Sequence, residues 1–240
     1  MLLVGNDIVD LNEAGIRGKS RHTRFVTRVF TEKERKMIHA APNSDLALWI
    51  LWAAKESAYK IVSKRFGPPV FSHQKFEASF EKEESWFEED RSAVWVAYAD
   101  TQYQFDFENH QKYVHAVGTF VTCGKRGDYI LFSKTVRVTQ NELACWQDKK
   151  VWQQMFSEKE QESVHRAESA YVRFLSKKAL AEKLNVASNR LQIIRPERDG
   201  KSEPPHILLD NHRCEIDLSL SHHGRWIAWC FGMPQSLAPQ

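Results

Sequence analysis

The stretch NSDLALWILWAAKESAYKIVSKRFG, residues 43–67, carries the clearest helix signals in the chain. Residues 43–45 offer polar N-cap side chains, and Gly67 is a typical stop signal. These signals predict a helix of about 20 residues. Two lysines and a glutamate lie inside this apolar segment. Their setting needs an explanation, because charged groups are seldom buried without partners.

Glu56 and Lys60 have the i,i+4 spacing of a helical ion pair and share a helix face with Trp52. One interpretation is a surface ion pair beside a buried stripe, worth a few tenths of a kcal/mol. However, the apolar run 49–54 leaves little solvent-facing surface, and Asp7 adds a carboxylate near the end of the first predicted strand. A partly buried glutamate needs a cation, and a second carboxylate without its own lysine indicates a metal. Such oxygen ligands favour Mg²⁺ or Mn²⁺.

The segments on either side of this helix predict a mixed α+β fold. Residues 2–11 form an apolar run that ends in carboxylates, as expected for a strand. Thr31 and Glu34 have the spacing of a capping box and predict a helix start after Phe30. Aromatic and β-branched residues then predict antiparallel strands over 70–80, 92–100, 102–109 and 113–122.

The second half of the chain predicts a similar order of elements. After a boundary at CGKRGD, residues 123–128, we expect one more strand over 129–138. A second capping box, from Ser157 to Glu160, precedes an amphipathic helix predicted over 169–185. Further strands are predicted over 191–196, 206–210 and 214–232.

One short pattern occurs in both halves. VFTEKER (29–35) and MFSEKEQ (155–161) repeat a phenylalanine, a capping hydroxyl and Glu-Lys-Glu, each just ahead of a longer predicted helix. A capping box alone is weak evidence, because such boxes are common. Together with the shared order of helix and strands, the repeat predicts two related α+β lobes.

Composition and charge describe a folded, soluble chain. Hydrophobic residues make up 42% and charged residues 27% of the 240 residues, which excludes a disordered or fibrous protein. A net charge of +3 is too mild to indicate a nucleic-acid binder. The opening MLLVGNDIVD lacks the features of a secretory signal, and no later apolar run is long enough to span a membrane. Four scattered cysteines without CxxC spacing fit a cytoplasmic protein.

Three segments of the first half resemble the signature of the 4′-phosphopantetheinyl transferase superfamily. They are GNDIVDL (5–11), FTEKE (30–34) and WAAKESAYK (52–60), in this order. Residues 1–122 are similar to a complete subunit of the smaller acyl-carrier-protein-synthase type within that superfamily. The resemblance implies a lobe over 1–125 that carries the metal-binding and Lys-Glu-Ser motifs.

The second half resembles the two-lobed, surfactin-synthetase type of the same superfamily. DGKSEPPHI (199–207) and LSLSHHGRWIAWCF (218–231) are similar to segments that precede the G-x-D segment in that type, whereas here they follow it. The resemblance therefore implies a circularly permuted pseudo-dimer of two similar lobes, each a long helix packed on a small antiparallel sheet. A connecting strand or linker would span 126–150, and the lobe over 151–240 would grip coenzyme A.

The resemblance also implies an activity and the residues that perform it. Family members move the 4′-phosphopantetheine arm of coenzyme A to a serine of an apo carrier protein and release adenosine 3′,5′-bisphosphate. Asp7 and Glu56 match the family's Mg²⁺ ligands, and Glu56 would accept the serine proton directly or through water. Lys60 matches the lysine that contacts the phosphates. Val9 stands where the surfactin type has a second carboxylate, so Asp10 is left as a residue that would lie near the metal.

Residues of the second half match family positions that grip the nucleotide. They are Lys201, Ser221 and His222, with Arg173 added by rough alignment and His222 facing the 3′-phosphate. His115 and His223 are interpreted as structural, because lone histidines in strands usually are. The basic segment Arg17–Arg28 is a candidate for docking an acidic carrier protein, with a solvated loop as the alternative.

Two other hypotheses remain at this point. The chain could be a non-catalytic accessory protein that binds coenzyme A or a carrier protein, although it retains Asp7, Glu56 and Lys60. An unrelated Mg²⁺-dependent phosphatase or nuclease would need further clustered carboxylates, which the sequence does not offer. Two lobes in one chain predict a monomer, and the carrier served, from fatty-acid, polyketide or peptide synthesis, stays open.

Overall fold

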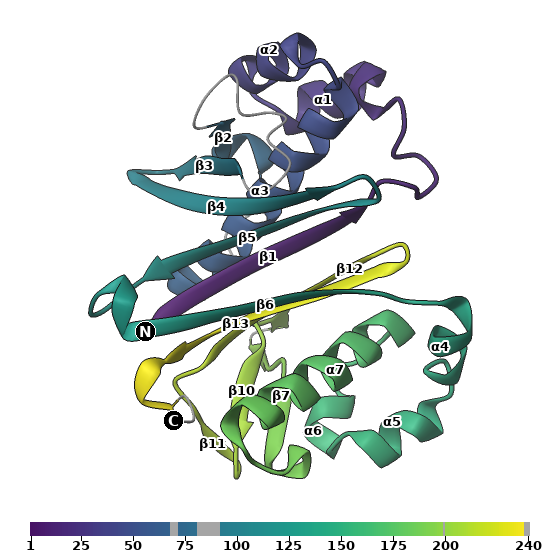
Figure 1. Ribbon diagram of the computed structural model, residues 1–240, viewed down its shortest axis with the longest axis vertical. Coiled ribbons are helices and arrows are strands. Elements are labelled where there is room, and N and C mark those ends of the chain that lie inside the picture. Colours follow the sequence, from purple (N-terminus) through teal and green to yellow (C-terminus); the bar gives the residue numbers. More distant parts are fainter. Residues whose placement is uncertain (68–71, 81–91, 199, 238–240) are drawn as a thin grey trace. The chain divides into compact units, whose positions relative to one another are not determined.

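Two compact units divide the chain in the computed structural model, which describes residues 1–67, 72–80, 92–198 and 200–237. The N-terminal unit is Gly5–Phe120, and the C-terminal unit is Val121–Gln240 together with Met1–Val4. Each unit contains antiparallel strand pairs and helices (Figure 1). The predicted α+β class is therefore confirmed.

The N-terminal unit is built around a five-stranded sheet with the order β1-β5-β4-β3-β2. The strands of this sheet are β1 (Leu2–Asp10), β2 (Glu77–Phe80), β3 (Ser92–Tyr98), β4 (Thr101–His110) and β5 (Tyr113–Val121); the start of β1 up to Val4 and the last residue of β5 are counted with the C-terminal unit. Its helices are α1 (Thr23–Val29), α2 (Glu32–Ala40) and α3 (Ser44–Phe66), with 3₁₀ turns at Lys19–Arg21 and His73–Lys75. Helix α3 packs on β2, β3 and β4, so it forms the second layer of this unit.

Helix α3 matches its prediction closely, with Asn43 as the N-cap and Gly67 as the C-cap. The Asn43 side chain accepts a hydrogen bond from the Leu46 backbone N–H at 3.1 Å. More than one face of the helix is buried, from Ala47 to Leu51 and again around Lys55, Ser57 and Ala58. A helix buried on several sides has no wide solvent face for charged groups.

Gly5 brings β1 unusually close to α3. A Cβ atom at this position would lie 2.2 Å from the Ser57 backbone oxygen and 2.9 Å from the Ile61 side chain. Only glycine allows this approach of backbone to backbone. The residues that follow Gly5 on the strand are therefore held directly against the middle of α3.

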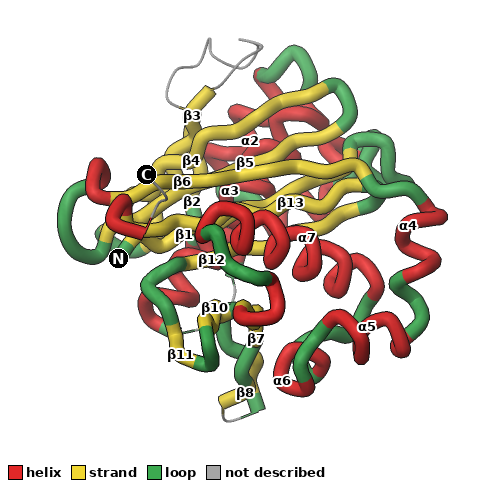
Figure 2. The backbone as a smooth tube through the Cα atoms, turned by 60° about the horizontal axis from the view of Figure 1, so that its bottom comes forward, coloured by secondary structure: helices red, strands yellow, loops and turns green. Residues whose placement is uncertain are grey.

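The C-terminal unit contains two small sheets, with the strand orders β6-β13-β12 and β7-β10-β11. Its strands include β6 (Tyr129–Arg137), β7 (Leu191–Ile194), β10 (His206–Leu209), β11 (His212–Arg213), β12 (Asp217–His223) and β13 (Trp226–Pro234). A short hairpin joins β8 (Glu197–Arg198) to β9 (Lys201–Ser202). Its helices are α4 (Gln140–Cys145), α5 (Lys149–Met155), α6 (Glu158–Gln161) and α7 (Ala167–Leu184), shown in red in Figure 2. Three further 3₁₀ turns lie at Arg126–Asp128, Ser188–Arg190 and Gln235–Leu237.

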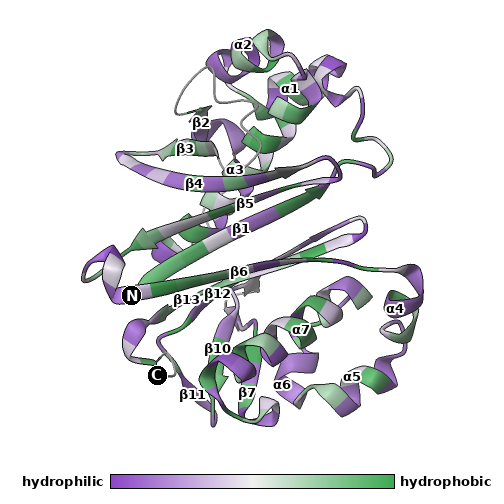
Figure 3. Cartoon of the chain, viewed as in Figure 1, coloured by the Kyte–Doolittle hydropathy of each residue, from purple (hydrophilic) through white to green (hydrophobic). Residues whose placement is uncertain are grey.

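The core of the C-terminal unit lies between α7 and the strands. Val172 and Leu180 of α7 are buried with Ile193 of β7 and with Trp229 and Phe231 of β13. Hydrophobic and hydrophilic residues alternate along α7 in Figure 3, as expected for a helix with one buried stripe. The strand–helix–strand order of this unit, β6 then α6 and α7 then β7, parallels β1, α2 and α3, and β2 in the N-terminal unit.

Two local predictions were wrong. The strand predicted over 70–80 is a strand only at Glu77–Phe80; His73–Lys75 form a 3₁₀ turn, and 70–71 lie outside the described residues. The basic segment Arg17–Arg28 was not predicted to be helical, but Thr23–Val29 forms α1. His22 caps this helix by accepting a hydrogen bond from the Phe25 N–H at 3.2 Å, and histidine is not among the preferred N-cap residues.

Candidate active site

Asp7 lies in the middle of β1, opposite Lys60 of α3. The Lys60 ammonium donates a hydrogen bond to the Asn6 backbone oxygen at 2.6 Å and another to Asp7 Oδ1 at 3.1 Å. The Asp7 and Lys60 side chains are 17% and 27% exposed, so solvent still reaches the pair. The close approach at Gly5 makes this contact possible, because it places β1 within reach of a lysine on the facing helix.

Glu56 lies one helical turn before Lys60, and its charge reaches Asp7. Burial raises the pKa of Asp7 to about 6, the charge of Lys60 opposes this rise, and the charge of Glu56 adds to it. The charge of Glu56 therefore acts on Asp7 across a partly desolvated setting. The structure therefore brings together the three residues that the sequence predicted for the reaction, Asp7, Glu56 and Lys60.

His73 is a residue near this site that sequence reasoning missed. Its Nε2 atom lies 3.5 Å from Glu56 Oε1, and its ring stacks on Trp52 with a centroid separation of 4.8 Å. The segment around His73 was predicted as a strand, and no motif places this side chain against α3. Trp52 therefore orients the His73 ring, which in turn lies beside Glu56.

The two carboxylates fit a hard divalent cation. Mg²⁺ is commonly held by one or two protein carboxylates, with waters and substrate phosphates as its other ligands. Among the described residues, no three His, Cys, Asp or Glu side chains form a metal-binding group. Val9 is buried, and the Asp10 carboxylate accepts a hydrogen bond from the Asn12 N–H at 2.9 Å, which shapes the turn after β1. Asp7 and Glu56 are accordingly the pair suited to such an ion.

His115 lies beneath the candidate site and is almost fully buried. Its Nε2 atom lies 3.2 Å from Asn6 Nδ2. Burial lowers the pKa of His115 to about 3, and the nearby charge of Lys60 lowers it as well. The ring is therefore neutral at physiological pH. This setting fits the structural role that we predicted for His115.

The residues predicted to grip the nucleotide lie in the C-terminal unit. Ser221 is buried and His222 is exposed on β12, where they pair with Ala228 and Ile227 of β13. Adjacent strand residues point to opposite faces, so Ser221 and His222 present their side chains to different sides of the sheet. The backbone of Lys201 forms part of β9, but its side chain lies outside the described part of the structure.

Arg173 lies in α7 and is only 5% exposed. Its Nη1 donates a hydrogen bond to Ser169 Oγ at 2.7 Å, while its buried Nε has no hydrogen-bond partner among the described residues. Burial lowers the pKa of this guanidinium to about 10, and the charge of Arg195 lowers it further while Glu160 opposes. Two arginines of like charge therefore lie near each other in this unit.

A pocket of about 630 Å³ lies beside α6 and β7 in the same unit. Its lining contains two basic residues, Lys159 and Arg195, two acidic residues, Glu162 and Glu197, and Ser163. The Ser163 hydroxyl accepts a hydrogen bond from the Arg195 N–H at 2.7 Å and so fixes the backbone at the pocket wall. Neither Lys159 nor Arg195 was predicted as a site residue, because no motif singles them out.

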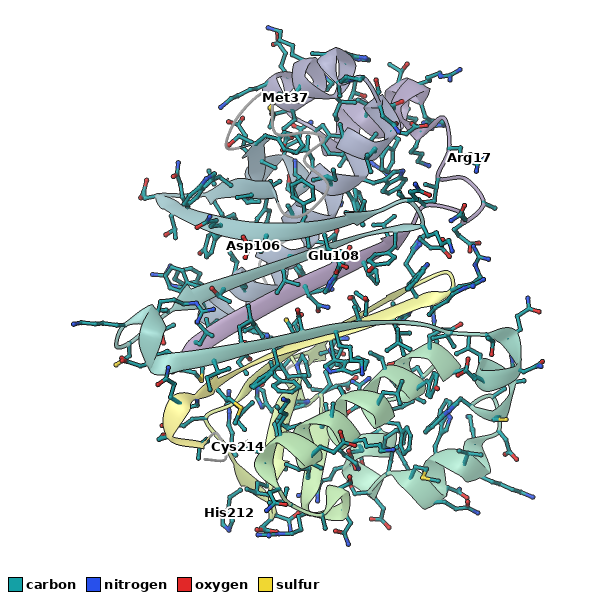
Figure 4. All side chains as sticks on the ribbon, in the orientation of Figure 1. Arg17, Met37, Asp106, Glu108, His212 and Cys214 are labelled. Carbon is teal, nitrogen blue, oxygen red and sulfur yellow. The ribbon has the colours of Figure 1, made fainter. Side chains whose placement is uncertain are left out.

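The basic segment before α3 is fixed to the start of that helix. The Asp45 carboxylate accepts hydrogen bonds from the backbone N–H groups of Gly18 and Ser20 at 2.6 and 2.8 Å. Arg17 is labelled in Figure 4 on the connection between β1 and α1. The arginines of this segment at positions 17, 21, 24 and 28 are all exposed.

A site of this kind, with two carboxylates and a lysine held between a strand and a helix, is typical of metal-assisted phosphate chemistry. A comparison with protein families matches residues 3–118 to the 4′-phosphopantetheinyl transferase superfamily. This N-terminal part of the chain, residues 3–118, belongs to the superfamily, and the matched residues include Asp7, Glu56 and Lys60. Membership supports a transferase that acts in phosphopantetheine transfer; the superfamily uses coenzyme A and a divalent metal and acts on carrier proteins.

A comparison with curated proteins found no match. Within the described residues, none of the helices combines the length and the apolar character needed to cross a membrane.

Proposed function

We propose that the chain transfers the 4′-phosphopantetheine arm of coenzyme A to a serine of an apo carrier protein and releases adenosine 3′,5′-bisphosphate. The observation that carries this proposal is the grouping of Asp7, Glu56 and Lys60 inside the segment that matches the superfamily. The oxygen of the serine attacks the β-phosphorus, the new P–O bond forms, and the bond to the nucleotide phosphate breaks. The serine loses its proton, and the nucleotide leaves with the negative charge.

Asp7 and Glu56 would hold Mg²⁺, and Mn²⁺ could replace it. The cation supplies charge neutralisation at the pyrophosphate of coenzyme A. The two side chains come from different elements, so the metal position depends on the packing of β1 against α3. Gly5 secures that packing.

Glu56 is the proposed base that accepts the serine proton, directly or through water. A carboxylate within hydrogen-bond reach of the attacking hydroxyl is suited to this task. Lys60 is proposed to contact the phosphates and to stabilise or protonate the leaving group. Its ammonium already lies 3.1 Å from Asp7 Oδ1, beside the position proposed for the metal. A lysine suits this role because it is a compact positive charge on a flexible stem.

The C-terminal unit is proposed to supply the nucleotide contacts through Lys201, Ser221, His222 and Arg173. The Arg173 side chain is buried and donates a hydrogen bond to Ser169, so we assign it a role through its charge. We propose that its charge acts together with Lys159 and Arg195 at the neighbouring pocket. Lys159 and Arg195 attract an anionic ligand, and Glu162 and Glu197 in the same lining reduce that attraction.

We also propose that the two units are permuted, related lobes that act as a pseudo-dimer within one chain. Supporting this proposal, both units place a capping box and a long helix between an opening strand and later antiparallel strands, although the C-terminal strands form two sheets, β6-β13-β12 and β7-β10-β11. The working boundaries are a metal-binding lobe over 1–125, a connecting segment over 126–150 and a nucleotide-binding lobe over 151–240. We expect a cytoplasmic monomer without nucleic-acid or membrane partners, and its mass in solution tests the monomer.

The proposed protein partner is an apo acyl or peptidyl carrier protein that presents an acidic surface beside its serine. The exposed arginines of the segment Arg17–Arg28 offer complementary charge. Charge reversal at Arg24 and Arg28 should raise the KM for the carrier and leave the KM for coenzyme A unchanged. An unchanged KM for the carrier would remove this segment from the docking surface.

The direct test is incubation with fluorescent coenzyme A, Mg²⁺ and a panel of apo carrier proteins from fatty-acid, polyketide and peptide synthesis. We expect covalent label on at least one carrier, and the carrier that is labelled identifies the pathway. Absence of label on every carrier would favour the alternative, a non-catalytic protein of this family that binds coenzyme A or a carrier protein.

A further inference from the structure

We infer that Lys55, together with Glu34, is a positioning residue that fixes the rotation of α3 so that Glu56 reaches Asp7. The catalytic consequence of this inference rests on the proposed function. The positioning itself depends only on packing within the N-terminal unit, so hydrogen exchange can test it without any measurement of activity.

Lys55 is fully buried and holds three oxygen atoms. Its ammonium donates to Glu34 Oε1 at 2.8 Å, to Glu34 Oε2 at 2.7 Å and to the Val29 backbone oxygen at 3.1 Å. Both side chains of the ion pair are 0% exposed, and the ammonium also lies 5.1 Å from the centre of the Phe30 ring. A buried ammonium with three acceptors in place has little freedom to move.

Glu34 connects this lysine to two other elements. One carboxylate oxygen accepts the Ala78 N–H of β2 at 2.7 Å, and the other accepts the Thr31 N–H at the start of α2 at 2.7 Å. We call Lys55, Glu34 and the Val29 oxygen the N-terminal lysine clamp. The clamp joins α3 to the start of α2 and to the edge strand β2.

The residue on the other side of Glu56 is fixed as well. Ser57 donates a hydrogen bond to the Ala116 backbone oxygen of β5 at 3.3 Å, and its own backbone oxygen is in contact with Gly5 of β1. Consecutive helical residues project about 100° apart. Contacts at Lys55 and Ser57 therefore fix the rotation of α3 on two sides, and Glu56 between them is held where its charge acts on Asp7.

The C-terminal unit contains the same lysine–glutamate arrangement, but no carboxylate follows its lysine as Glu56 follows Lys55. Lys177 of α7 lies 3.0 Å from both oxygens of Glu160, 3.3 Å from the Met155 oxygen and 5.3 Å from the centre of the Phe156 ring. Glu160 accepts the Ile193 N–H of β7 at 3.0 Å. The residue after this C-terminal lysine clamp is Lys178. The second clamp is thus a matched control for the first.

The experiment compares two double variants of the full chain, Glu34→Gln/Lys55→Met and Glu160→Gln/Lys177→Met. Each replaces a buried ion pair by a neutral pair of similar volume, a change that often preserves folding. Glutamine also keeps an oxygen for the strand N–H. Circular dichroism verifies the fold, and hydrogen exchange of peptides covering residues 52–60 reports the local freedom of α3. The kcat and the KM for coenzyme A are measured on a labelled carrier.

We expect the Glu34→Gln/Lys55→Met variant to exchange faster at 52–60 and to lose about 100-fold in kcat, the cost typical of a misplaced catalytic group, with little change in KM. The Glu160→Gln/Lys177→Met variant should keep wild-type exchange at 52–60 and its kcat within twofold. Equal losses of kcat in both variants would overturn the inference, as would unchanged exchange at 52–60 in the first. If the wild-type chain labels no carrier, the proposed function fails, and the exchange comparison alone decides the positioning.

Discussion

The two lysine clamps of this protein use the same contacts and differ in the residue that follows them. In each, a lysine on the long helix binds a glutamate from a capping box, a backbone oxygen two residues before the capping residue, and the face of the phenylalanine between. The next residue is Glu56 in the N-terminal unit and Lys178 in the C-terminal unit. The clamp is therefore a scaffold shared by both units, and a single neighbouring carboxylate distinguishes the unit that carries the candidate active site.

The two capping boxes also have matching side-chain hydrogen bonds beside them. Arg35 donates to the Phe30 oxygen at 3.2 Å, and Gln161 donates to the Phe156 oxygen at 3.0 Å, at matching positions of the repeat. These shared contacts support the proposal that the two units are related lobes. They also show that a buried lysine and glutamate can serve packing alone, so burial of charge by itself does not identify a catalytic residue.

Changing the two residues that follow the clamps should produce the largest difference between the units. Glu56→Gln should lower the rate of phosphopantetheine transfer by about 1,000-fold or more while the fold stays intact, because both the base and a metal ligand are lost. Lys178→Gln should leave the rate near that of the wild type. Steady-state labelling of a carrier measures both, and an active Glu56→Gln variant would remove the base assignment.

Replacing the lysine of each clamp should lower the free energy of unfolding by a similar amount in both units. Lys55→Met leaves Glu34 buried without its cation, and Lys177→Met does the same to Glu160; each should lower the free energy of unfolding by about 3–5 kcal/mol. Urea unfolding followed by circular dichroism measures this loss. A loss below about 1 kcal/mol at either site would contradict a scaffold role for that clamp.

Glycine substitutions compare a backbone clash with a side-chain clash. In Gly5→Ala the new Cβ would lie 2.2 Å from the Ser57 backbone oxygen, which cannot move without shifting α3. We expect a loss of about 3 kcal/mol in stability, together with lower transfer activity. In Gly232→Ala the nearest atoms are the ends of Leu2 and Val4 at 2.8 and 2.9 Å, which can shift. A larger stability loss in Gly232→Ala than in Gly5→Ala would contradict the close packing of β1 on α3.

The smallest effect is expected from the neutral histidine under the candidate site. Because the pKa of His115 is lowered to about 3 in the folded chain, the unfolded chain binds its proton first, and stability falls as the pH drops below about 6.5. Between pH 7.5 and 5, wild type should lose about 2 kcal/mol more than His115→Gln. Urea unfolding at both pH values gives the difference. Parallel pH curves for the two proteins would contradict a buried neutral His115.

The sequence predicted the elements better than the contacts between them. The capping boxes at Thr31 and Ser157 are present as predicted, because capping depends on neighbouring residues only. The spacing of a capping box does not reveal that Glu34 and Glu160 are also buried and bind lysines on another helix. Those contacts depend on tertiary packing. The Lys55 setting that the sequence left unexplained is therefore resolved by the structure.

The candidate site shows the same limit. The motif residues Asp7, Glu56 and Lys60 were found from the sequence, and the structure brings them together. His73 was missed because its segment was predicted as a strand, whereas it forms a 3₁₀ turn against Trp52. For Arg173 the alignment gave a position in the chain but could not give its burial, which depends on how α7 packs.

The most direct test of this account is the stoichiometry of Mn²⁺ binding in the presence of coenzyme A, measured by electron paramagnetic resonance. A single metal-binding pair, Asp7 and Glu56, predicts one bound Mn²⁺ per chain, which is lost in Asp7→Asn and in Glu56→Gln and retained in Lys178→Gln. Two ions per chain, no ion in the wild type, or an ion that persists in Glu56→Gln would contradict it.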